Sequence, residues 1–160
     1  MKKNSGFSLV ELIVVIAIMA ILVGVLAPAY LKYVEKSRKS KDIDAISEMM
    51  SSADKIAVDD EDVTDSTTFT ITVGSKKLTL AVANGGSNTL TQWQKSSGLT
   101  SNTYELSSKT FKGKTTGALT GDVDDEGSVI WTGTGAFAKN SSTAGDFTNF
   151  SSDLNKKLAS

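Results

Sequence analysis

The chain has 160 residues, enough for one small globular domain with an extension. It contains no cysteine, which excludes disulfides and thiolate chemistry, and no histidine, the commonest general base and metal ligand. Lys and Arg number 17 against 18 Asp and Glu, so the composition shows no general footprint of nucleic-acid binding. Carboxylate pairs remain for acid–base chemistry, and no motif places them in a cleft, so we expect no enzyme.

An uncharged, mostly apolar run covers residues 12–31. Its length matches the ~20 residues that a helix needs to cross the ~30 Å hydrocarbon core of a bilayer. Glu11 stands directly before the run, where a carboxylate without a partner is costly to bring into a membrane. An acid at this position indicates a function beyond that of a plain anchor.

The start of the chain resembles the amino-terminal signature of type IV pilins and pseudopilins, through the run Gly6-Phe7-Ser8-Leu9-Val10-Glu11-Leu12. The resemblance continues through Tyr30 and Tyr33 and fades near Lys41, so it covers about the first quarter of the chain. It implies that a prepilin peptidase removes residues 1–6 as a leader, cutting after Gly6. The same enzyme would then methylate the new amine on Phe7.

The resemblance also implies partners and a location. The subunit would first span the cytoplasmic membrane once, with its amino terminus inside and lipid around its helix. An assembly platform with its ATPase would then build it into a homopolymer, a pilus on the cell surface. In the filament, Glu11 would set the register by pairing with the amine of Phe7 on a neighbouring subunit.

Two features of the sequence oppose this interpretation. Ala27-Pro28-Ala29 fits the cleavage pattern of a conventional signal peptide, with residues 12–26 as its apolar core. That alternative leaves both Glu11 and the Gly6-Phe7 pair unexplained, so we favour processing of the pilin type. In addition, more basic residues follow the run than precede it, and the positive-inside rule alone would place the head in the cytoplasm. Here we follow the resemblance.

Gly24 and Pro28 predict a weak point in the helix. Pro28 has no N–H, and its ring crowds the carbonyl of residue 24, so one helical hydrogen bond is lost. Glycine is the weakest ordinary helix former. We therefore expect a kink or a locally melted turn here. By the resemblance, this segment unwinds as the helix moves from membrane to filament, and a simple kink in an anchor is the alternative.

Residues 32–58 predict an amphipathic continuation of the helix. Apolar residues recur there at spacings of three or four, as for a helix packed on a sheet: they are Ile43, Ile46, Met50, Ala53 and Ala57. The charged residues between them are expected on a solvated face: Lys41, Asp42, Asp44, Glu48, Asp54 and Lys55. The acidic run 59–62 ends the pattern, because acids are unfavourable at the carboxyl end of a helix.

In the remainder, alternating apolar residues predict strands at 67–73 and 77–82, joined by Gly74-Ser75 into an antiparallel hairpin. A short helix carrying Leu90 and Trp93 is expected to start at Asn88 or Thr89 and to stop near Gly98. Further strands are predicted at 103–106, 109–112 and 128–137, and a closing helix at 146–158.

An acidic loop in this region matches part of a calcium-binding pattern. Asp122, Asp124 and Glu126 fall on the first, third and fifth positions of a calcium loop, but Gly133 stands where a closing glutamate belongs. Some pseudopilins of type II secretion, which share the amino-terminal signature, bind calcium in a carboxy-terminal loop. We favour a charged hairpin loop over a calcium site, and we expect no other cofactor.

The predicted fold is α+β: a long amino-terminal helix, membrane-spanning in its first half, packs on a small antiparallel sheet head, as in type IV pilins. The predicted parts are the leader 1–6, the transmembrane and filament-core helix 7–31, its amphipathic continuation 32–58 and the head 59–160. The predicted function is that of a pilus subunit. The alternatives are a pseudopilin of a type II secretion or DNA-uptake machine, and a secreted or anchored binding module or enzyme.

Overall fold

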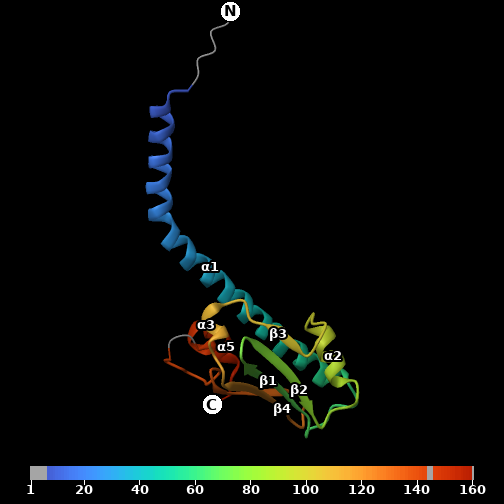
Figure 1. The fold of residues 1–160 in the computed structure, drawn as a ribbon. Coiled ribbons are helices and arrows are strands. Elements are labelled where there is room, and N and C mark those ends of the chain that lie inside the picture. The colour runs from blue at the N-terminus through green and yellow to red at the C-terminus, as the bar shows by residue number, and fades with distance from the viewer. Residues whose placement is uncertain (1–6, 144–145, 160) are drawn as a thin grey trace, which may run out of the picture. The chain divides into compact units, whose positions relative to one another are not determined.

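The computed structural model describes residues 7–143 and 146–159 (Figure 1). The chain divides into two compact units, Met1–Ser37 and Arg38–Ser160. Helix α1, Leu9–Asp59, begins in the first unit and ends in the second. Its ends lie within a residue or two of the predicted ones, and the acidic run after Asp59 forms a loop as expected.

Residues 12–31 of α1, in the first unit, are uncharged and mostly apolar on every side. The large apolar side chains of α1 from Leu9 to Leu31 are all exposed. By length and composition α1 can cross a membrane, and none of its most apolar window is buried within the chain. A helix that is apolar all round is stable inside a membrane or a protein core. This half of α1 therefore needs lipid or other protein chains around it.

The predicted weak point lies inside this half. α1 is helical without interruption from Gly24 through Pro28, so the melted turn is not present in this structure. A Cβ added at Gly24 would meet no atom within 4 Å, so packing inside the chain does not require a glycine there. Unwinding of this segment during assembly stays a prediction.

In the described part of the second unit, five strands form one antiparallel sheet with the order β3-β2-β1-β4-β5. The strands are β1 (Thr68–Gly74), β2 (Lys77–Ala83), β3 (Thr103–Glu105), β4 (Gly117–Val123) and β5 (Val129–Gly135). The short helices are α2 (Thr89–Ser96), α3 (Lys109–Lys112), α4 (Phe147–Phe150) and α5 (Ser152–Lys157). This is the predicted α+β fold.

The second half of α1 packs on one face of the sheet. The predicted apolar stripe, including Ile46 and Met50, is buried and meets the inward side chains of the central strands, such as Phe69 and Leu119. Trp93 of α2 completes this core: its ring meets that of Phe69 edge-on at 5.1 Å. Its Nε1 donates a 2.7 Å hydrogen bond to the carbonyl oxygen of Met49 on α1.

Several predicted elements of the head are confirmed. β1 and β2 form the expected antiparallel hairpin, although Ser75 and Lys76 make the turn, and Lys76 adopts the left-handed backbone with a φ of 70°. α2 starts and stops where the sequence indicates, and the strand predicted at 103–106 is β3. The strand predicted at 128–137 is the shorter β5.

Other predictions for the head were wrong. Residues 109–112 form the helix α3, because the Ser108 hydroxyl accepts a hydrogen bond from the Phe111 N–H and caps a helical turn. The closing helix at 146–158 is divided into α4 and α5 by Ser151, whose backbone is extended. β4 was not predicted at all, although it lies between β1 and β5.

Asp42 corrects the prediction of a fully solvated polar face on α1. Its side chain is completely buried, and its carboxylate accepts hydrogen bonds from the loop before α3. The donors are the backbone N–H groups of Ser107 and Ser108, at 2.8–3.0 Å, and the hydroxyl of Tyr104 at 3.1 Å. Asp54 is exposed as predicted, and it also accepts a 3.0 Å hydrogen bond from Nε1 of Trp131.

Replacing Asp42 should destabilise the head. Asp42→Ala leaves the buried N–H of Ser108 and the half-buried N–H of Ser107 without their acceptor, and hydrogen bonds to a charged group contribute about 1.5–3 kcal/mol each. We expect a loss of about 3 kcal/mol in the free energy of unfolding, measured on the full chain in detergent. Asp44→Ala, on the exposed side of the same helix, should change it by no more than about 0.5 kcal/mol. Equal effects of the two substitutions would contradict this role of Asp42.

Tyr104 should make stability depend on pH in the alkaline range. Burial raises the pKa of its hydroxyl to about 12, and the charge of Asp42 adds to that shift. The folded chain therefore holds this proton more tightly than the unfolded chain, whose tyrosine titrates near pH 10. The resulting stabilisation is complete below about pH 10 and is lost as the pH rises through about 12.

Tyr104→Phe removes this titration. The urea midpoint of the variant should fall less steeply between pH 10 and 12 than that of the unchanged chain. Tyr33→Phe serves as the control, because the lysines titrate identically in both variants. A slope unchanged by Tyr104→Phe would show that the Tyr104 hydroxyl titrates alike in the folded and unfolded states.

Candidate assembly site at the start of the helix

The first turn of α1 is closed by Ser8 and Glu11. The Ser8 N–H donates a 2.9 Å hydrogen bond to Oε2 of Glu11, and the Val10 N–H donates a 3.3 Å bond to the Ser8 hydroxyl. α1 begins at Leu9, so Ser8 is the N-cap residue and Glu11 is the third residue of the helix. Reciprocal bonds of this kind, with a serine three residues before a glutamate, form a capping box.

The capping box gives Glu11 a role within its own chain. The carboxylate lies at the amino end of the helix, where the helix dipole also favours a negative charge. From the sequence, Glu11 was interpreted only as a costly acid that needs an external partner. The three-residue spacing of Ser8 and Glu11 is the sequence signal for this local role.

The surroundings of this turn are apolar and open. The side chain of Phe7 is 92% exposed, and those of Leu9 and Val10 are also exposed. The Glu11 carboxylate therefore lies at the edge of a surface that burial in lipid or protein would make dry. Gly6 and the rest of the predicted leader fall outside the described residues, so the structure does not test the cleavage and methylation predicted at Gly6 and Phe7.

The other candidate site, the acidic loop, serves as the turn between β4 and β5. Oδ1 of Asp124 accepts hydrogen bonds from the N–H groups of Glu126 (3.0 Å) and Ser128 (2.7 Å). Oδ1 of Asp122 accepts one from the Thr68 hydroxyl at 3.0 Å. Asp124 therefore stabilises the turn of the β4–β5 hairpin, and Asp122 bonds across the β1–β4 pairing.

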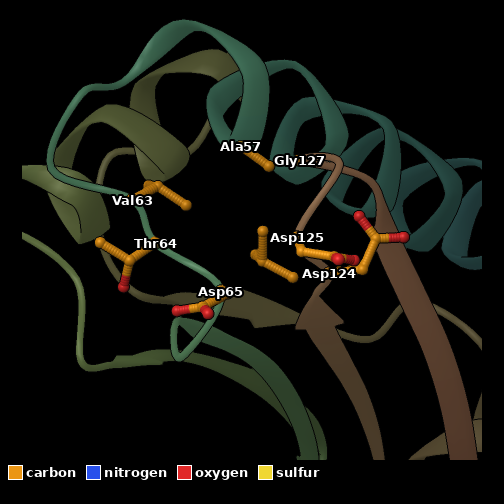
Figure 2. A pocket seen from close by; sticks show the side chains of 8 residues that line it. Ala57, Val63, Thr64, Asp65, Asp124, Asp125 and Gly127 are labelled. Carbon is orange, nitrogen blue, oxygen red and sulfur yellow. The ribbon is translucent and has the colours of Figure 1, made fainter.

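This loop borders a hollow of about 340 Å³, which Figure 2 shows from close by. Asp65 lines it from the segment that follows α1, and Asp124 and Asp125 line it from the hairpin. Within the described residues, no three acidic side chains gather closely enough to form a group that could hold a metal ion. A calcium site at Asp122, Asp124 and Glu126 therefore has no geometric support here.

Comparison with known proteins bears on the amino-terminal site. Residues 1–27 match the family model of the prokaryotic N-terminal methylation motif. Neither the search of curated proteins nor the search of solved structures gives a match. The chain thus carries the class III signal peptide of type IV pilins and pseudopilins, and its long amino-terminal helix, whose second half packs on an antiparallel sheet, is a pilin-like fold.

Two substitutions should separate the capping role of Glu11 from its charge. Glu11→Gln keeps an acceptor oxygen for the Ser8 N–H, whereas Glu11→Ala removes it. Losing a helix cap costs about 0.5–2 kcal/mol, so Glu11→Ala should speed amide exchange in the first turn by about 2- to 30-fold. Hydrogen exchange of the chain in detergent micelles measures this. If Glu11→Gln exchanges as fast as Glu11→Ala, the acceptor oxygen does not hold the turn.

Proposed function

We propose that the chain is a structural subunit of a type IV pilus. The observation that carries this proposal is the exposed apolar half of α1. It follows Glu11 directly, and most of it falls within residues 1–27, which match the methylation motif. After removal of the leader and methylation of Phe7, the subunit waits in the cytoplasmic membrane as a single span. Its partners are the prepilin peptidase, the assembly platform with its ATPase, and further copies of itself.

Assembly exchanges lipid for protein around the apolar helix. Burial from water contributes roughly 25 cal/mol per Å² of apolar surface, which keeps this surface either in the membrane or in the filament core. Because lipid and protein are both apolar, burial alone does not select a register between neighbours. A specific polar contact does so, and Glu11 is the only acid before residue 32.

The capping box is compatible with this pairing. A carboxylate offers about four lone-pair sites on two oxygens. Glu11 can therefore accept the Ser8 N–H of its own chain and still accept a methylated amine of Phe7 from a neighbour. The cap also fixes the position of the carboxylate before the neighbour arrives, so little side-chain freedom is lost on docking.

A pseudopilin of a secretion or DNA-uptake machine shares the same motif and the same requirement for Glu11. Cellular location separates the two. A pilus subunit is recovered in filaments sheared from the cell surface and begins with methylated Phe7 by mass spectrometry. A protein that begins with methylated Phe7 but stays in the envelope is a pseudopilin, and one that begins after residue 29 belongs to neither group.

Charge at Glu11 should be essential for filaments. Glu11→Gln keeps the cap but removes the charge, and breaking a buried pair costs about 3–5 kcal/mol because the other charge is left alone. We expect leader removal to continue and sheared filaments to be lost. The matched control is Ser8→Ala, which weakens the cap but keeps the carboxylate and should still give filaments.

Co-expression with the unchanged chain sharpens this experiment. Glu11→Gln subunits should enter mixed filaments poorly, because each subunit supplies the partner of the next. Full incorporation of Glu11→Gln, alone or in mixture, would mean that the carboxylate does not dock subunits.

A further inference from the structure

The charges of the second unit are separated between its two ends. Residues 59–65 and 122–126 contain nine of the 18 acidic residues and no basic one. The β1–β4 pairing brings these two segments together, since Thr68 lies opposite Asp122 in the register. They line the same hollow in Figure 2. We call this the acidic end.

Basic residues gather at the opposite end, where the chain enters the unit. Arg38 and Lys41 lie on α1 beside Asp42, whose carboxylate holds the loop at Ser107 and Ser108. That loop is joined to the turn between β1 and β2, because the Leu106 N–H donates a 3.0 Å hydrogen bond to the carbonyl oxygen of Lys76. The basic end is defined by five residues: Arg38, Lys41, Lys76, Lys77 and Lys112.

The carboxylates nearby do not cancel this charge. Glu105 lies opposite Lys77 in the β2–β3 register. Asp44 is exposed on α1 and lines a second hollow together with the exposed Asp153, so these three carboxylates stand against the five cations. The Asp42 carboxylate is fully buried and directed at the loop. All the cations that define the basic end are exposed except Lys112, which is half-buried. The basic end therefore presents a net positive surface to solvent.

Chain connectivity keeps the basic end close to the membrane. Only six residues separate Leu31, the last of the apolar run, from Arg38. At 1.5 Å per residue these positions lie about 10 Å apart along a helix, and at most about 25 Å apart in a fully extended chain. The headgroup layer adds about 5–8 Å outside the hydrocarbon core, and charges act over a Debye length of about 8 Å at physiological salt.

We propose that the basic end docks on the phosphate groups of anionic phospholipids and so orients the head while the subunit is still in the membrane. The inference rests on the proposed function, which places the apolar half of α1 in a bilayer. An anionic surface attracts the basic end and repels the acidic end, so it selects one orientation of the head. The same contact explains why cations follow the apolar run although the positive-inside rule opposes their export.

The competing partner is the acidic end of a second copy, which is also anionic. Connectivity favours lipid, because every subunit in the membrane brings its own basic end to the headgroups, at any subunit concentration. Contact with a second copy depends on how many chains share the membrane. The experiment below varies lipid charge and chain number independently.

The test uses the full mature-length chain in nanodiscs, one chain per disc, with a single cysteine for a donor dye. The chain has no native cysteine. Ser75→Cys places the dye at the basic end, and Ser87→Cys places it beside Gly86, which faces Asp62 at the acidic end. Energy transfer to a dye on the lipid headgroups is compared in phosphatidylcholine with and without phosphatidylglycerol, at low and high salt.

We expect transfer from position 75 to rise with phosphatidylglycerol and to fall at high salt, while transfer from position 87 stays low. Each lysine near an anionic surface should shift the docking equilibrium about fivefold. Changing Lys76, Lys77 and Lys112 to Gln should therefore reduce it roughly a hundredfold. The matched control removes the same charge elsewhere on the head by changing Lys55, Lys95 and Lys157 to Gln, and it should keep most of the transfer.

Four results would overturn the proposal. Transfer that ignores lipid charge but rises when several chains share a disc would assign the basic end to a second copy. Equal losses from the two triple variants would show a response to net charge and not to this surface. A chain that fails to insert, as judged by extraction at alkaline pH, would refute the proposed function as well. An inserted chain without lipid-dependent transfer would refute only the docking.

Discussion

The head depends on the burial of one stripe of α1 against one face of the sheet. The short helices add Trp93, Phe111, Phe147 and Leu154 to the same core. The Trp93 bond to Met49 and the Asp42 bonds to the loop at Ser107 then fix α1 in one position along its axis. Hydrophobic burial supplies most of the stability, and these directional bonds specify the arrangement.

The same helix therefore meets two different demands. Up to Leu31 it is apolar on every side and suits lipid or a bundle of like helices, and from Asp42 onward it is amphipathic and suits a sheet. An acid with a defined hydrogen-bonding role lies near the start of each region: Glu11 in the first and Asp42 in the second. One caps the helix on which it lies, and the other holds a neighbouring loop. A helix with only one of these patterns could not serve both as an anchor and as the spine of a head.

Elements with a clear period were predictable from the sequence. The long helix, the β1–β2 hairpin and α2 each carry several apolar residues at regular spacing, and the processing signature is long and position-specific. α3 was mistaken for a strand because four residues cannot distinguish the two periods. Its cap at Ser108 was the informative residue.

Residues whose role depends on distant parts of the chain were not predictable. Asp42 lies among other charged residues of α1 and resembles any solvated acid, and only the fold brings the loop at Ser107 to it. β4 was not predicted because Gly121 interrupts its apolar alternation between Leu119 and Val123. Gly6 and Phe7, where processing is predicted, were recognisable by their motif alone, and the local role of Glu11 by its spacing from Ser8.

Gly121 has a consequence for how this sequence can vary. It lies directly opposite Trp131 in the β4–β5 register, and a Cβ at this position would come within 2.6 Å of the Val129 side chain and 3.0 Å of the indole ring. A larger residue at 121 is therefore tolerated only where both Val129 and the indole have given way to smaller side chains. Among related chains these three positions should co-vary, with a glycine wherever the valine and the tryptophan are kept. The indole N–H of Trp131 also donates a hydrogen bond to Asp54 on α1. Loss of the indole would remove this reason for an acid at position 54, so that residue could vary as well.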